Sequence, residues 1–145
     1  MRFILTAALF STILEVSTAC SCLPTTPAES YNLADWLSHV RVLSKREMNN
    51  IVHRQEIVYT VQHINIYKNT KGRQLLSPEI WTPKETATCG VPFLEPEKEY
   101  LLPGFYDNDS KLNINLCSPI LEWKDVSDDI KSKLKAGEFS KKTST

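Results

Sequence analysis

The residues best placed to do chemistry are Cys20 and Cys22, which stand one residue apart directly behind the small residues Ser17-Thr18-Ala19. Cleavage after Ala19 would leave Cys20 with a free α-amine. The reference pKa of such an amine is about 7.7–8.0, so its neutral, metal-binding form is accessible near physiological pH. The amine nitrogen and carbonyl oxygen of one residue can close a five-membered chelate on Zn²⁺. A rigidly held terminus of this kind could displace the water on a catalytic zinc and block hydrolysis.

Residues 1–19 have the order of a secretory signal peptide. A positive charge at Arg2 precedes an apolar run from Phe3 to Leu14, and small residues follow. The run is too short and too interrupted for a membrane span, and no later segment resembles one. We therefore expect a signal peptide over residues 1–19 and one secreted, extracellular domain over residues 20–145, with a loose polar tail from about residue 138. The alternative is a buried amino-terminal helix.

The expected secreted chain contains four cysteines, Cys20, Cys22, Cys89 and Cys117. An even count in a secreted chain favours two disulfides. Pairing of Cys20 with Cys22 is sterically poor, because alternate residues of an extended chain lie about 7 Å apart. Either remaining pairing ties the amino terminus to distant parts of the chain and would supply the rigidity that chelation needs. Two alternatives are that the disulfides only stabilise a small domain, and that CxC is a redox or metal-binding pair.

Composition and motifs argue against several classes of protein. Lys plus Arg equals Asp plus Glu at 17 each, so no basic excess points to nucleic acid as a partner. The sequence contains no HExxH, GxSxG, Walker or GxGxxG motif, so we expect neither an enzyme nor a cofactor of its own. The histidines His39, His53 and His63 are scattered over strand-like and hairpin segments, which favours structural or surface roles over metal ligation.

The rest of the chain has to hold the amino terminus in place, and its pattern is mainly β. Thr26-Pro27-Ala28-Glu29 has the order of a capping box and predicts a short helix from about Pro27 to Ala34. β-branched, aromatic and alternating residues predict five strands. These strands are Trp36–Leu43, Ile57–Tyr67, Glu79–Thr82, Tyr100–Leu102 and Leu112–Leu116.

Two irregularities are expected in the first strand pair. The apolar residues change phase at Ile64 and Ile66, which predicts a β-bulge in a strongly curved sheet. The polar stretch from Lys45 to Gln55 is predicted to be an exposed hairpin tip. A second helix is predicted after Ser127 as N-cap, with Gly137 to end it. Five short strands and two peripheral helices predict a small closed, or nearly closed, antiparallel barrel of the OB type.

One triplet, Asn108-Asp109-Ser110, has the pattern of an N-glycosylation acceptor. It falls within a cluster of turn-forming residues, from Asp107 to Ser110, between two predicted strands. We therefore expect Asn108 to be exposed.

Several separated motifs, in this order, resemble the amino-terminal domain of the tissue inhibitors of metalloproteinases. The resemblance extends from Cys20 to about Leu134. The motifs are Cys20-Ser21-Cys22-x-Pro24-x-x-Pro27, Cys89-Gly90-Val91, Lys98-Glu99-Tyr100-Leu101-Leu102-x-Gly104, Lys111-Leu112-x-Ile114-x-Leu116-Cys117-Ser118, and then Trp123 and Ser127.

The resemblance implies a five-stranded, netrin-like barrel of the OB class with disulfides Cys20–Cys89 and Cys22–Cys117. It also implies that a segment, here called the wedge, enters the active-site cleft of a zinc metalloendopeptidase of the matrix metalloproteinase type. The wedge consists of Cys20, Ser21, Cys22, Leu23 and Pro24. Its Cys20 amine and carbonyl would bind the zinc of the protease, and Ser21 would lie at the mouth of the primary specificity pocket.

Further contacts with the protease are implied for the loop Thr86, Ala87 and Thr88 and, to a lesser extent, for Arg46 to His53 and the loop before Cys117. Two departures from the family pattern are expected: Asn32 stands where another cysteine is usual, and we expect no disulfide-rich carboxy-terminal domain. We expect a monomeric, single-domain inhibitor of narrower or weaker activity. The alternative is a secreted netrin-type binding or signalling module that inhibits nothing.

Overall fold

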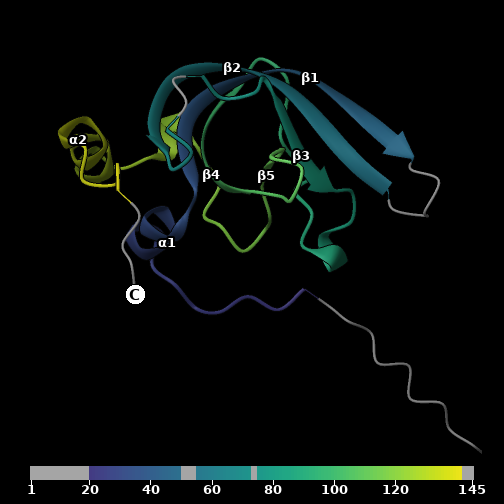
Figure 1. Cartoon of the computed structure of the whole chain (residues 1–145), viewed down its shortest axis with the longest axis horizontal. Coiled ribbons are helices and arrows are strands. Elements are labelled where there is room, and N and C mark those ends of the chain that lie inside the picture. Colours follow the sequence, from purple (N-terminus) through teal and green to yellow (C-terminus); the bar gives the residue numbers. More distant parts are fainter. Residues whose placement is uncertain (1–19, 50–54, 73–74, 142–145) are drawn as a thin grey trace, which may run out of the picture.

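Five strands of the computed structural model form a closed ring (Figure 1). The structure describes residues 20–49, 55–72 and 75–141, so the expected signal peptide lies outside it. Around the ring the strands are β1 (Trp36–Asn49), β2 (Gln55–Asn69), β3 (Glu79–Pro83), β5 (Leu112–Asn113) and β4 (Glu99–Tyr106), which pairs back to β1. Among the strand pairs of the described residues, only β3–β5 is parallel. The prediction of a closed, netrin-like barrel of the OB type is confirmed.

The first two strands are longer than predicted, and the expected hairpin tip from Lys45 to Gln55 is wrong at both ends. Lys45 pairs with Tyr59 and Asn49 pairs with Gln55, so β1 and β2 continue as a ribbon. The length of β1 could not be predicted from the sequence because the end of this strand is polar and exposed. Several of its partners on β2 are buried, and an exposed ion pair accompanies the pairing, with Arg46 Nη2 2.5 Å from Glu79 Oε1 on β3. Residues 50–54 lie outside the described part.

The predicted bulge in β2 is confirmed, and it is one of three register shifts. The pairing with β1 skips Ile64 and Tyr67 on β2 and Leu43 on β1. Each extra residue bends its strand and increases the local twist, which a small barrel needs in order to close. Ile64 and Leu43 are partly exposed as a result, at 38% and 45% of their surface.

Two apolar clusters lie on opposite faces of β1 and β4. Inside the barrel are large residues such as Trp36, Tyr59 and Leu102. On the other face, Leu37 and Leu101 pack with α1 (Pro27–Leu33) and α2 (Asp128–Ala136). Neighbouring residues of a strand point to opposite faces, so the two strands are buried on both sides where the helices cover them.

The predicted short helix α1 is held by its cap and by a buried lysine. Thr26 and Glu29 form the expected capping box, with the Glu29 carboxylate 2.8 Å from the Thr26 backbone nitrogen. Lys68 on β2 is 2% exposed, and its Nζ donates to the carbonyl oxygens of Tyr31 (3.2 Å) and Asn32 (2.7 Å). These two bonds satisfy carbonyls at the carboxyl end of the helix. They also fix the backbone of Asn32 at this end of the helix.

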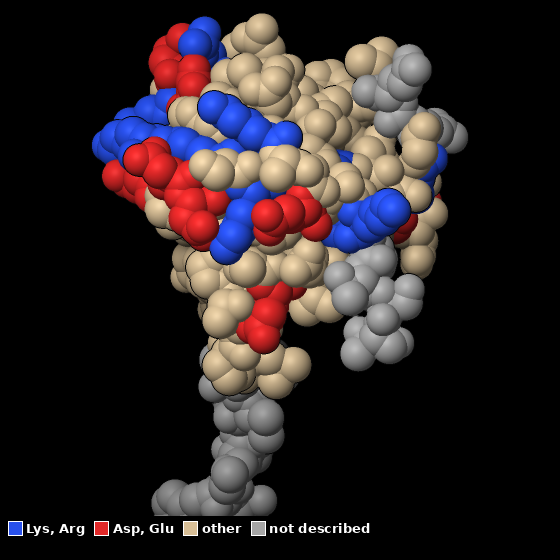
Figure 2. All heavy atoms as spheres, turned by 90° about the vertical axis from the view of Figure 1, so that its left-hand side faces the viewer, with Lys and Arg blue, Asp and Glu red and all other residues tan. Residues whose placement is uncertain are grey.

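The carboxy-terminal segment packs onto the barrel through an aromatic stack. Trp123 lies in the 3₁₀ helix η2 (Trp123–Asp125), and its ring stacks on His39 with 3.8 Å between centroids. Ser127 caps α2, and Gly137 ends it in a left-handed conformation, as predicted. The expected loose tail from about residue 138 is wrong for Phe139, which is 3% exposed and packs edge-on against Tyr31. Figure 2 shows charges of both signs interspersed on the face that carries α2.

The last predicted strand, Leu112–Leu116, is wrong beyond Asn113. The Asn115 side chain accepts a hydrogen bond from the backbone nitrogen of Cys117, which turns the chain out of the sheet. A short strand β6 (Leu121–Glu122) that the sequence did not predict pairs with β4. In the described ranges, no helix is long and apolar enough to cross a membrane.

The structure shows which atoms contact the two ring nitrogens of His63. Its Nε2 lies 2.8 Å from the Ser77 carbonyl oxygen, which can only accept, so Nε2 carries the hydrogen. Nδ1 lies 2.9 Å from the Ser38 hydroxyl oxygen, which is also 3.0 Å from the carbonyl oxygen of Asn65. Burial lowers the pKa of His63, and the hydrogen bond to Ser77 opposes this only in part.

We expect stability to fall in acid partly through His63. Its pKa is lower in the folded than in the unfolded state, so as pH falls below about 6.5 the unfolded chain gains a proton that the folded chain resists. The free energy of unfolding should therefore decrease over this range, and less so in His63→Gln. Urea midpoints measured at several pH values between 7.5 and 5.5 test this. Equal slopes in the two proteins would contradict it.

Candidate functional site

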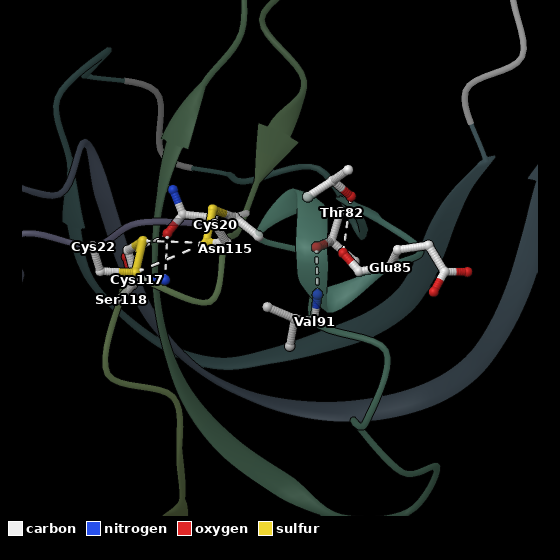
Figure 3. Close-up of a disulfide and its surroundings, with 10 residues drawn as sticks. Cys20, Cys22, Thr82, Glu85, Val91, Asn115, Cys117 and Ser118 are labelled. Carbon is white, nitrogen blue, oxygen red and sulfur yellow. Dashed lines mark hydrogen bonds between the residues drawn. A yellow bond between two sulfur atoms is a disulfide. The ribbon is translucent and has the colours of Figure 1, made fainter. Parts of the chain in front are cut away.

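Two disulfides converge on the amino-terminal segment (Figure 3). Cys20 is joined to Cys89 with 5.0 Å between Cα atoms, and Cys22 is joined to Cys117 with 5.2 Å. This is the pairing that the family resemblance implies. The Cys20 sulfur lies 3.9 Å from that of Cys22 and 3.8 Å from that of Cys117. Since all four cysteines are in disulfides, CxC offers no thiolate for redox chemistry or metal binding.

The two loops that receive these disulfides are hydrogen-bonded to each other. The backbone nitrogen of Leu116 donates to the carbonyl oxygen of Cys89 at 2.8 Å. Asn115 Oδ1 accepts from the backbone nitrogen of Cys117 at 3.1 Å and from the Ser118 hydroxyl at 3.5 Å. The anchors of Cys20 and Cys22 therefore form one connected unit, and both cysteines are held against it.

The remaining residues of the wedge are exposed between and beyond these anchors. Ser21, Leu23 and Pro24 are all exposed, and Leu23 has 85% of its surface accessible. A terminal segment normally pays a large conformational entropy cost when a partner orders it. Here the disulfides have already restricted the backbone, so less entropy is lost on binding. The wedge therefore exposes both polar and apolar side chains on a backbone whose conformation is already restricted.

The loop before Cys89 lies on one side of this segment. Thr86, Ala87 and Thr88 form the exposed 3₁₀ helix η1 (Thr86–Thr88), which ends at Cys89 in a left-handed conformation. The Thr88 hydroxyl donates to the carbonyl oxygen of Glu85 at 2.9 Å. The disulfide Cys20–Cys89 thus joins η1 directly to the start of the wedge.

The chain just after Cys89 is pinned to the barrel. The backbone nitrogen of Val91 donates to the Thr82 hydroxyl on β3 at 2.9 Å. The buried hydroxyl of Tyr59 on β2 donates to the Val91 carbonyl oxygen at 2.8 Å. Through Val91, two strands of the barrel fix the position of the first disulfide.

A hollow of about 370 Å³ lies on the Leu23 side of the wedge, and sequence reasoning did not find it. Leu33 at the end of α1 and Phe105 near the end of β4 supply its apolar walls, and both are partly exposed at 54% and 39%. Gly104 and Asn115 also line it. No local pattern could have joined these residues, because they come from separate elements that only the closed barrel brings together.

Other residues singled out from the sequence lie apart from the wedge. His39 and His63 lie in the sheet and bond protein atoms, His39 to Glu99 at 2.8 Å and His63 to Ser38 and Ser77, so they have structural roles. Arg46 belongs to the outer half of the β1–β2 ribbon, and His53 lies outside the described residues.

Comparison with known proteins shows that the sequence of this chain matches one family. Residues 18–140 match the family model described as tissue inhibitor of metalloproteinase. The chain is 29% identical to "Putative metalloproteinase inhibitor tag-225" of Caenorhabditis elegans, across 91% of this chain and 95% of that protein. It is 31% identical to metalloproteinase inhibitor 2 of Homo sapiens and of Rattus norvegicus, across 88% of this chain but only 59% of each of those proteins.

Gly90, which follows Cys89, is a position that the fold restricts sterically. A Cβ atom there would lie 2.0 Å from the carbonyl oxygen of Pro83 and 2.8 Å from that of Glu85. Both are backbone atoms that a rotamer change cannot move away. The Gly90 nitrogen also donates to the Glu85 carbonyl oxygen at 2.9 Å, which closes the turn around η1.

We expect Gly90→Ala to destabilise the fold by about 1–3 kcal/mol, the usual cost of forcing extra volume into packed structure. The displaced loop should also make Cys20–Cys89 easier to reduce. Urea midpoints and the rate of reduction by dithiothreitol, followed by peptide mapping, measure the two effects. Gly137→Ala is the control, because alanine would be strained at this left-handed position, which ends α2 away from the disulfides. Equal reduction rates in the two variants would contradict the expectation.

Proposed function

Because the chain belongs to the tissue inhibitor of metalloproteinase family, we propose that it is a secreted inhibitor of zinc metalloendopeptidases of the matrix metalloproteinase type. The observation that carries the proposal is the exposed wedge, fixed by Cys20–Cys89 and Cys22–Cys117 on a hydrogen-bonded pair of loops. The family's members are inhibitors and not enzymes. The matched human relative is longer than this chain, so the proposal concerns the barrel and its wedge alone.

In the proposed mechanism, signal peptide removal after Ala19 makes Cys20 the first residue. Its α-amine nitrogen and carbonyl oxygen would then chelate the catalytic zinc of the protease. A zinc protease needs one coordination position for the water that attacks the substrate. Chelation occupies that position, so no hydroxide is generated and the peptide bond is not hydrolysed.

Residues next to Cys20 are proposed to set which proteases are bound. Ser21 is exposed, and its neighbours Cys20 and Cys22 are both tethered, so its side chain can enter the primary specificity pocket without rearrangement. Leu23 and Pro24 continue along the cleft. Thr86, Ala87 and Thr88 are exposed on η1, joined to the wedge through Cys89, and would contact the rim of the cleft.

Secretion, extracellular action as a monomer and a one-to-one complex are parts of the same proposal. The signal-like residues 1–19 and two disulfides support an oxidising, extracellular location. Equal numbers of acidic and basic residues give no support for a nucleic-acid partner.

One added residue tests the chelation step. Adding a single alanine before Cys20 turns the Cys20 nitrogen into an amide, moves the free amine one residue away from the tethered position, and leaves both disulfides in place. Inhibition of a matrix metalloproteinase catalytic domain should weaken on the order of 100-fold or more, since even outer-shell changes at metal sites cost about 10–100-fold. The measurement is titration of the protease with protein whose amino-terminal residue has been determined, with the melting temperature as the folding control.

Unchanged inhibition by the alanine-extended protein would refute chelation. Absence of inhibition by the unmodified protein with a free Cys20, against several proteases, would instead support a netrin-type binding module.

A substitution at Ser21 tests the proposed pocket contact. Ser21→Gly removes a side chain that is exposed, so the melting temperature should change little. The ratio of inhibition constants between a protease with a shallow specificity pocket and one with a deep pocket should change several-fold. Thr25→Gly, at an exposed position just beyond the wedge, is the matched control. A ratio that moves equally in both variants would show that Ser21 does not enter the pocket.

A further inference from the structure

The turn between β4 and β5 has its shape set by one side chain, that of Asp107. Its Oδ1 accepts from the backbone nitrogens of Asp109 at 2.9 Å and Lys111 at 2.8 Å. The backbone of Asp107 also pairs with Lys111 and accepts from the nitrogen of Ser110 at 3.0 Å. These bonds account for the turn without any contribution from the side chain of Asn108.

Asn108 is exposed at this turn, and no hydrogen bond among the described residues uses its carboxamide. It begins the one Asn-x-Ser/Thr triplet in the sequence, Asn108-Asp109-Ser110, with a residue other than proline in the middle. A group attached to the Asn108 nitrogen would therefore displace no bond and would point into solvent.

We propose that Asn108 is an N-glycosylation site. The Asn108 carboxamide nitrogen forms a bond to the anomeric carbon of an oligosaccharide, the carbon–oxygen bond to a lipid-linked pyrophosphate breaks, and the nitrogen loses one proton. The donor is thus a lipid-pyrophosphate oligosaccharide of the secretory pathway. The inference rests on the secretion proposed above, and it does not depend on zinc chelation or protease binding.

The folded turn is a poor acceptor, which places the modification before folding. The hydroxyl of Ser110 is required in the triplet, but in the folded protein it accepts from Lys71 Nζ at 2.5 Å. Ser110 also has a left-handed backbone, with φ of 64°, so the triplet is tightly curved. Lys71 is held nearby over the ring of Tyr106, 4.3 Å from its centroid.

The order of the chain allows this timing. Asn108 precedes Cys117 in the sequence, and Cys117 is needed for the second disulfide. β5, which the turn leads into, also follows Asn108 and must pair with β3 and β4 before the ring closes. During synthesis the triplet therefore enters the secretory compartment while the barrel is still open.

The test is secretion from a eukaryotic cell line, with residues 1–19 either native or replaced by a signal sequence of the host. The secreted protein should lose mass on treatment with peptide-N-glycosidase, with Asn108 converted to aspartate in the released peptide. Ser110→Ala should abolish the shift, and Ser110→Thr should retain it. Asp107→Ala should also retain it, because this change alters the turn and leaves the triplet intact.

An unmodified Asn108 in protein secreted with the host signal sequence would overturn the proposal. If only the version with native residues 1–19 fails to be secreted, the signal peptide proposal fails and the glycosylation site stands. Equal inhibition of a protease by the glycosylated protein and by Asn108→Gln would show that the glycan at Asn108 does not affect binding through the wedge.

The timing has its own test. Unglycosylated protein is incubated with oligosaccharyltransferase and its lipid-linked donor, either oxidised and folded or reduced and unfolded. Transfer to the unfolded chain alone is expected. Equal transfer to the folded protein would overturn the inference that modification precedes folding.

Discussion

The covalent attachment of residues 20–22 to two distant loops is the constraint on which the rest of this molecule depends. Cys89 and Cys117 lie 69 and 95 residues from their partners, so each disulfide joins this segment to a loop that is distant in the sequence. The barrel in turn fixes both loops, through Val91, which bonds Thr82 on β3, and through Ile114, whose backbone nitrogen donates to the Trp81 carbonyl oxygen on β3. A small domain with a modest core thereby holds an exposed segment, residues 20–24, in a fixed position, which short segments seldom achieve alone.

Closure of the ring depends on β1, which pairs with β2 along its whole length and with β4 through its first half. The β1–β2 pair must curve strongly to close the ring. The residues that its pairing skips, Leu43 on β1 and Ile64 and Tyr67 on β2, allow this curvature. The helices then cover the outer face. Lys68 shows how the fold fixes α1 without a third disulfide, since a buried ammonium bonds two helix carbonyls.

Local patterns predicted the elements well where one interaction decides the structure. The capping box at Thr26, the N-cap at Ser127 and the bulge at Ile64 are of this kind. Prediction failed where distant partners decide: the polar end of β1 is a strand because it pairs with buried Tyr59, Val58 and Ile57. Phe139 is buried because its ring packs against that of Tyr31, which is distant in the sequence. The hollow beside Leu23 combines residues from α1 and β4 and has no local signal.

The residues that stabilise the fold differ from those proposed to contact a protease, and this difference has an evolutionary consequence. Ser21 and Leu23 are exposed and belong to neither apolar cluster, so most replacements there leave the folding free energy nearly unchanged. On the proposed mechanism, such replacements alter the fit to a protease cleft. Duplicated copies of this gene could therefore diverge in target preference by drift at a few positions, without first acquiring compensating changes in the barrel.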